Sequence, residues 1–136
     1  MLKRFTISLD EKLLEHFDTF IQQQKYVNRS EAIRDLIRSS LVENEWQADK
    51  DVVGVISMVY DHHQPKLQEK VTEIQHDYHH QIVSATHIHM DHHNCLEVVI
   101  VKGTAGSVNE LSDRLRSLRG VRNCKLAMGT TGRDLH

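Results

Sequence analysis

Histidine and cysteine are concentrated in one short stretch of the chain, residues 87–95, which has the sequence HIHMDHHNC. Nine of the 11 histidines of the chain lie between His62 and His93. Imidazole nitrogen and thiolate sulfur are the ligands that borderline and soft transition metals prefer in proteins. The composition of this stretch therefore predicts a metal site rather than a set of ordinary surface histidines.

Three of these side chains are expected to meet because of the geometry of two neighbouring strands. Residues 82–90 and 96–103 have the composition of strands, and a short polar turn joins them. His87 and His89 are two residues apart, so both side chains point from the same face of their strand. Cys95 lies at the start of the next strand, directly across the turn. Together these residues predict a site with two nitrogen ligands and one sulfur ligand.

The helix expected before these strands suggests a fourth ligand. Leu67, Val71 and Ile74 form an apolar stripe on this helix. At 100° per residue, His76 lies about 180° from that stripe and points away from the core of its own subunit. It is either a solvated histidine or a ligand that reaches the metal site of a second copy of the chain. In the second case, metal binding is coupled to assembly.

The residues leave the identity of the metal open. A tetrahedral zinc site accepts three nitrogens and one sulfur, while a planar set of the same ligands suits Ni(II) or Cu(II). A blue-copper site is disfavoured, because Met90 faces the opposite side of the strand from the two histidines. Cys124 lies outside this stretch and is expected to pack as a small apolar residue.

The overall composition is that of a globular cytoplasmic protein. The chain has 136 residues, of which 39% are hydrophobic and 26% charged, and its formal charge is −2, so no basic field indicates nucleic acid. The sequence shows no secretory signal, no apolar run long enough for a membrane span and no disulfide framework. No Ser/His/Asp, P-loop or HExxH arrangement is present. We expect neither an enzyme nor a protein with a membrane partner or a small-molecule substrate.

The apolar patterns predict an α+β protein of two units joined by a polar linker. Residues 4–9 alternate like a half-buried strand and precede two helices, for which Asp10 and Ser30 are candidate N-caps. A lone strand needs a partner for its backbone groups. The simplest partner is the same strand of a second copy, which gives a two-stranded antiparallel ribbon; alternatively, residues 4–9 join the later sheet. After the linker, the order βαββαβ predicts a ferredoxin-like domain.

Two regions of the chain carry specific motifs. The segments RFTISLD and NRSEAIRDLIR (28–38) resemble a ribbon-helix-helix module, and TEIQHDYHH (72–80) with SATHIHMDHHNCLEVVIVKG (84–103) resembles the metal-binding part of a regulator. Together they resemble the NikR family of nickel-responsive transcriptional regulators. The resemblance implies the following division of the chain: a dimeric ribbon-helix-helix DNA-binding domain at 1–43, a linker at 44–51, and an ACT-type domain for metal binding and tetramerisation at 52–136.

The resemblance also implies which residues bind metal. It makes His76, His87, His89 and Cys95 the ligands of one Ni(II) per chain in a square-planar site, with His76 supplied by a neighbouring subunit of a homotetramer, a dimer of dimers. Six further histidines are not placed in the main site by the resemblance: His62, His63, His79, His80, His92 and His93.

The DNA contacts follow from the same resemblance. Arg4, Thr6 and Ser8 would lie on the outward face of the ribbon, where arginine and hydroxyl groups can bond to base edges of double-stranded operator DNA. Glu31 and Asp35 would hold a second, weakly bound cation. Without the resemblance, all five would be ordinary surface residues.

These roles predict a nickel-dependent repressor of nickel-uptake genes that binds a palindromic operator. Two other functions stay open at this point. In a metal store or chaperone, the histidines would buffer nickel and the first unit would only dimerise. In an antitoxin-like DNA-binding protein, the second unit would bind a protein or a small molecule.

Overall fold

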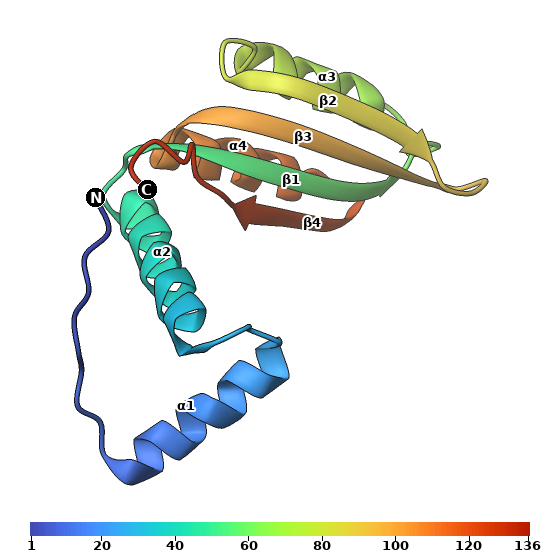
Figure 1. Ribbon diagram of the computed structural model, residues 1–136. Coiled ribbons are helices and arrows are strands. Elements are labelled where there is room, and N and C mark those ends of the chain that lie inside the picture. The colour runs from blue at the N-terminus through green and yellow to red at the C-terminus, as the bar shows by residue number, and fades with distance from the viewer. The chain divides into compact units, whose positions relative to one another are not determined.

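The structure is a computed structural model that describes residues 1–136 (Figure 1). It divides into two compact units, Met1–Ser40 and Leu41–His136. None of its helices combines the length and the apolar character that a membrane span requires.

The first helix of the first unit, α1, comprises Glu11–Gln24. Asp10 caps it as expected, because its side-chain Oδ1 accepts a hydrogen bond of 2.8 Å from the backbone N–H of Lys12. The helix ends at Lys25, which has the left-handed conformation with φ of 61° and donates its N–H to the last turn.

The second helix, α2, comprises Arg29–Gln47. The prediction that Ser30 caps it is wrong, since Ser30 already lies in the first turn. The cap is Asn28, whose Oδ1 accepts a hydrogen bond of 2.8 Å from the N–H of Glu31. Asn28 precedes the helix by one position, from which a short side chain reaches the free N–H groups of the first turn.

The first unit has almost no core within a single chain. Ala32 is its only buried residue, whereas Phe5 is 70% and Ile7 54% exposed. Residues 4–9 form no strand, because the chain offers them no partner for backbone hydrogen bonds. The alternative in which they join the later sheet is wrong, because all four strands of that sheet come from the second unit.

The second unit has the predicted order βαββαβ and is a four-stranded sheet with two helices on one face (Figure 1). All neighbouring strands are antiparallel, in the order β2-β3-β1-β4. The α+β fold class is therefore confirmed. The elements are β1 (Asp51–Asp61), α3 (Leu67–Asp77), β2 (Ile82–His89), β3 (Asn94–Thr104), α4 (Ala105–Arg116) and β4 (Val121–Met128).

The core lies between the sheet and the two helices. Alternate residues of β1 and β3 are buried on the helix-covered face, among them Ile56 and Val99. Val71 of α3 and Leu111 of α4 are fully buried against them. Gly54 leaves room for α4, since a Cβ at this position would lie 2.7 Å from Cγ1 of Val108.

The first half of the segment 44–51, expected to be a polar linker, is helical. Helix α2 continues to Gln47, and β1 begins at Asp51. The physical reason is Trp46, which is only 8% exposed and packs in the core of the second unit. Its Nε1 donates a hydrogen bond of 2.9 Å to the backbone oxygen of Gly129.

Candidate metal centre

The turn between β2 and β3 places Cys95 opposite His89 in the antiparallel pair. The turn is held by Asp91, whose Oδ1 accepts hydrogen bonds of 2.8 Å from the backbone N–H groups of His93 and Asn94. These bonds favour the ionised carboxylate and lower the pKa of Asp91 to about 2. A potential nitrogen ligand and a potential sulfur ligand thus lie opposite each other on two paired strands.

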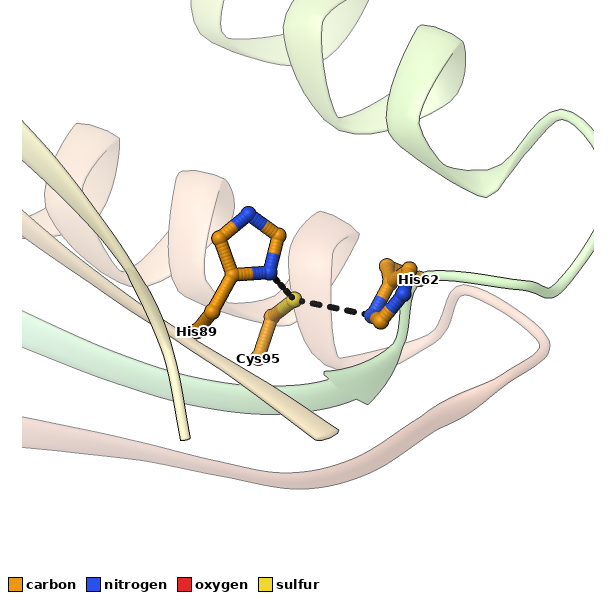
Figure 2. Close-up of side chains that lie close together, drawn as sticks. All are labelled: His62, His89 and Cys95. Carbon is orange, nitrogen blue, oxygen red and sulfur yellow. Dashed lines mark hydrogen bonds between the residues drawn. The ribbon is translucent and has the colours of Figure 1, made fainter. Parts of the chain in front are cut away.

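Three potential ligand atoms converge at this point (Figure 2). The Sγ atom of Cys95 lies 3.4 Å from Nδ1 of His89 and 3.2 Å from Nδ1 of His62, which follows the end of β1. Neighbouring ligands of one ion, with metal–nitrogen and metal–sulfur bonds of ordinary length, are about 3.1–3.6 Å apart. The three side chains therefore have the spacing of ligands to a single transition-metal ion.

Burial shifts the pKa values of Cys95 and His62 in opposite directions. It raises the pKa of the Cys95 thiol, and the negative charge of Glu97 adds to the effect. It lowers the pKa of His62, and repulsion from His63 adds to that effect. A neutral imidazole is the form that binds metal, while the thiol must lose its proton to become a ligand.

His87 lies on the same face of β2 as His89, and the centroids of the two rings are 5.0 Å apart. Its Nδ1 lies 3.1 Å from the hydroxyl of Tyr60 and 3.5 Å from Oε2 of Glu97. A ring nitrogen that donates to an oxygen leaves the other nitrogen free to bind a metal. Nε2 is therefore the atom of His87 available as a ligand.

A buried polar network behind His87 connects it to α3. The Tyr60 hydroxyl is within hydrogen-bonding distance of Oε1 of Gln68, at 2.8 Å, and of Oε2 of Glu97, at 3.0 Å. Gln75 donates from Nε2 to Oε1 of Glu97 at 3.2 Å. Burial, and then the charge of Glu97, raises the pKa of Tyr60, which keeps the hydroxyl protonated.

Neither this network nor the position of His62 was predicted from the sequence. The burial of Glu97 could have been predicted, because Glu97 is two residues from Cys95 on the same strand and therefore lies on the same face. Glu97 is indeed only 6% exposed. The proximity of His62 to Cys95 could not have been predicted from local spacing, because it depends on the pairing of β1 with β3.

His76 lies in the last turn of α3 and is exposed, as its angle on the helix predicted. Its ring stacks on that of His79, with centroids 5.4 Å apart. It is not part of the group around Cys95 within the chain. The structure thus brings together His89 and Cys95 of the four predicted ligands, places His87 beside them, and leaves His76 facing outward.

Comparison with known protein families accounts for both units. Residues 53–129 match the NikR C-terminal nickel-binding domain, and residues 3–43 match the ribbon-helix-helix proteins of the copG family. The chain belongs to the NikR family. It is thus a nickel-responsive regulator with a ribbon-helix-helix domain, and the donor set around Cys95 suits the nickel that its C-terminal domain binds.

Relatives of this NikR protein cover its whole length. A protein from Desulfotalea psychrophila is 65% identical over 136 residues, which is 100% of both chains. One from Thermococcus onnurineus is 52% identical over 135 residues, 98% of each chain. Both are described as nickel-responsive regulators. A solved structure of an uncharacterized protein from Thermotoga maritima covers 57% of this chain and 96% of its own, with a TM-score of 0.53 and 18% identity, which supports the fold alone.

The residues expected to contact DNA lie in the segment before α1. Arg4, Thr6 and Ser8 are all exposed. They alternate with Phe5 and Ile7, whose apolar side chains are exposed as well. In a paired strand the two sets would occupy opposite faces.

The two residues expected to hold a second cation have partners in the first unit. Glu31 forms ion pairs with Arg34 at 2.8 Å and Arg38 at 3.9 Å. Asp35 accepts a hydrogen bond from the hydroxyl of Tyr26. Each carboxylate thus has a partner within the chain: arginine side chains for Glu31 and a tyrosine hydroxyl for Asp35.

Proposed function

We propose that this NikR protein is a repressor of nickel-uptake genes that binds a palindromic operator when Ni(II) fills a His₃Cys site. The observation that carries the proposal is the cross-strand pair of His89 and Cys95, with their nitrogen and sulfur atoms 3.4 Å apart. His87 supports it from the same face, with Nε2 free. His76 of a second copy of the chain would complete the set, and one ion would bind per chain.

The exposed position of His76 supports a site shared between copies of the chain. Its helix turns Val71 and Ile74 inward and leaves His76 outside. Bound Ni(II) would then be held by His76 from the helix of one subunit and by the ligands on two strands of another. Within its own chain, His62 occupies the neighbourhood of Cys95 and would compete with the incoming imidazole.

Dimerisation of the first unit is supported by its lack of a core. Helix α1 has no buried residue, and Leu13 is 54% and Ile37 48% exposed. Burying such side chains against a second copy stabilises both, because apolar surface leaves water. Pairing of residues 4–9 between the copies would satisfy their backbone groups and direct Arg4 outward, and two-stranded ribbons fit the major groove. A tetramer would hold two such dimers.

Nickel would control DNA binding by selecting among arrangements of the two ribbon-helix-helix dimers. A ligand shifts such an equilibrium only by its different affinities for the two states. Moving the population from 1:99 to 99:1 takes a preference of about 5.5 kcal/mol. Four strong ligands, one of them from another subunit, would supply a preference of that size where the set is complete only in the arrangement that binds DNA.

The test is Arg4→Ala, compared with Arg133→Ala near the C-terminus as a control of the same residue type. A duplex selected from a random library by the nickel-loaded protein serves as the operator. Loss of one good base contact costs about 1–3 kcal/mol, which is about fivefold to 150-fold in affinity. Because the substitution removes Arg4 from every subunit on the palindromic operator, Arg4→Ala should weaken operator binding by at least that factor. Nickel affinity should not change, and Arg133→Ala should behave as the wild type.

The Arg4→Ala experiment, together with substitutions at the metal centre, separates the proposal from the other functions. Equal losses of nickel and operator affinity in Arg4→Ala would refute the division of roles between the units. DNA binding that is absent or independent of nickel would indicate a metal store or chaperone. An unchanged metal response after His87→Ala and Cys95→Ala would indicate an antitoxin-like protein with another ligand.

A further inference from the structure

The end of helix α2 is packed into the core of the nickel-binding unit. The boundary between the two compact units falls between Ser40 and Leu41, so residues 41–47 of this helix belong to the second unit. Trp46 is only 8% exposed there, and Val42 is partly buried against the same core. The two side chains are four residues apart and therefore lie on one face of the helix. This face holds the end of α2 on the second unit.

The residues that follow the last strand hold the end of α2 in place. The backbone oxygen of Gly129 accepts a hydrogen bond of 2.9 Å from Nε1 of Trp46. Thr130 donates from Oγ1 to Oε1 of Glu45 at 2.8 Å. The N–H of Gly129 donates to the backbone oxygen of Val53 at 2.8 Å, and a Cβ on Gly129 would lie 2.9 Å from that oxygen. Only glycine therefore lets the chain run this close to β1.

The turn between α2 and β1 is fixed by helix α4. Oδ1 of Asp49 accepts a hydrogen bond of 2.6 Å from the N–H of Gly106, and the backbone oxygen of Lys50 accepts one of 2.9 Å from the N–H of Ala105. Both N–H groups lie in the first turn of α4, where they have no partner within the helix. Residues 45–50 are thus bonded to the second unit and do not form a free linker.

We propose that Trp46, Gly129 and Thr130 form an anchor that couples nickel binding to DNA binding. Helix α2 begins in the DNA-binding unit and ends in this anchor. A rigid element held at its end can carry a change from one site to another, whereas a flexible linker would only tether the two units. The three residues act by positioning α2 and contact neither nickel nor DNA. The coupling rests on the proposed function, but the anchor itself does not.

The first experiment measures amide hydrogen exchange in the full-length protein. The N–H groups of residues 48–50 donate to backbone oxygens of α2, so their exchange reports opening of this segment. Trp46→Phe with Thr130→Val removes the indole N–H and the hydroxyl but keeps an aromatic ring and the shape of the threonine. Loss of one hydrogen bond shifts an equilibrium by about 2- to 12-fold, so two losses should increase opening by about 5- to 150-fold.

Thr131→Val is the matched control. The hydroxyls of Thr130 and Thr131 each accept from the N–H two residues later, at 3.1 Å and 3.4 Å. Of these two hydroxyls, only that of Thr130 bonds to α2. Exchange of residues 48–50 should therefore stay at the wild-type rate in Thr131→Val.

The second experiment measures operator affinity with and without Ni(II), using the selected duplex. Trp46→Ala with Thr130→Val removes the packing as well, which weakens the anchor by at least about 100-fold. The gain in operator affinity on adding nickel should fall by at least about tenfold, while nickel affinity, followed by the sulfur-to-nickel absorption band, stays within about twofold. If this variant does not fold, Gly129→Ala replaces it, because the new Cβ displaces the segment from Val53 and leaves Trp46 intact.

The outcomes separate the anchor from the proposed function. Unchanged exchange in Trp46→Phe with Thr130→Val, or an equal increase in Thr131→Val, would refute the anchor. A full gain in operator affinity in the variant that loses the packing would refute the coupling. Operator binding by the wild type that does not respond to nickel would refute the proposed function and the coupling together, and the exchange experiment would still decide whether the anchor exists.

Discussion

Tyr60→Phe tests whether the buried network positions His87 for nickel. Tyr60 is fully buried, and its hydroxyl lies 2.8 Å from Gln68, 3.1 Å from Nδ1 of His87 and 3.0 Å from Oε2 of Glu97. Phenylalanine keeps the ring and its packing, so no cavity forms. The substitution removes only the oxygen through which the three side chains are joined.

The expected magnitudes follow from the contacts that remain. Oε2 of Glu97 keeps only the Nδ1 of His87, at 3.5 Å, which is longer than an ordinary N–H···O bond. Leaving a buried acceptor without its partner costs about 1–3 kcal/mol, and more when it is charged, so the free energy of unfolding of the metal-free protein should fall by about 2 kcal/mol. Nickel affinity should fall by about 10–100-fold, the usual effect of losing an outer-sphere partner.

Two measurements and one matched control are needed. Denaturant unfolding of the metal-free protein, at equal chain concentrations, gives the change in stability. Competition with a nickel chelator gives the affinity. Tyr26→Phe is the control, because it also removes a hydroxyl bonded to a carboxylate, that of Asp35, but in the other unit. The control should leave nickel affinity at the wild-type value.

The outcomes distinguish a positioning role from a structural one. Lower stability with unchanged nickel affinity would show that the network supports the fold but does not orient His87. Unchanged stability, within about 0.5 kcal/mol, would contradict the argument that the buried carboxylate depends on Tyr60. An equal loss of nickel affinity in Tyr26→Phe would show that the loss in Tyr60→Phe does not arise from the position of His87.

Two further predictions concern the core and the thiol. Gly54→Ala should lower the free energy of unfolding by about 1–3 kcal/mol, because the new Cβ would lie 2.7 Å from Val108 and 2.9 Å from Leu126; denaturant unfolding tests this. Nickel uptake should release the proton of Cys95, since burial raises the pKa of this thiol. Nickel affinity should therefore rise with pH up to that pKa and fall as pH decreases, and calorimetry in two buffers of different ionisation enthalpy counts the proton.

Local patterns in the sequence predicted most of the scaffold of the metal centre. Period-two alternation put His87 and His89 on one face, and the short turn put Cys95 across from them. Both inferences need only a strand and a turn, whose geometry is fixed by neighbouring residues. The same holds for Asp10, whose cap acts over two residues.

Contacts between distant segments could not be predicted in this way. His62 meets Cys95 across 33 residues, because β1 pairs with β3 in the register that sets Tyr60 opposite Cys95. A shift by one residue would turn every side chain of the strand to the other face. Trp46 is a similar case: its surroundings in the sequence are polar, and only the packed core explains why the helix continues through it.

The order of elements in the second unit, the donor types at the metal centre and the family of the chain follow from the sequence alone. These properties depend on residue type and on spacing over a few positions. Long-range contacts bring the donors together: they place Tyr60 and Glu97 beside the ring of His87, and they group Asp61, His63 and His93. Strand register and turn conformation bring these groups together, and both are properties of the whole sheet rather than of any single segment.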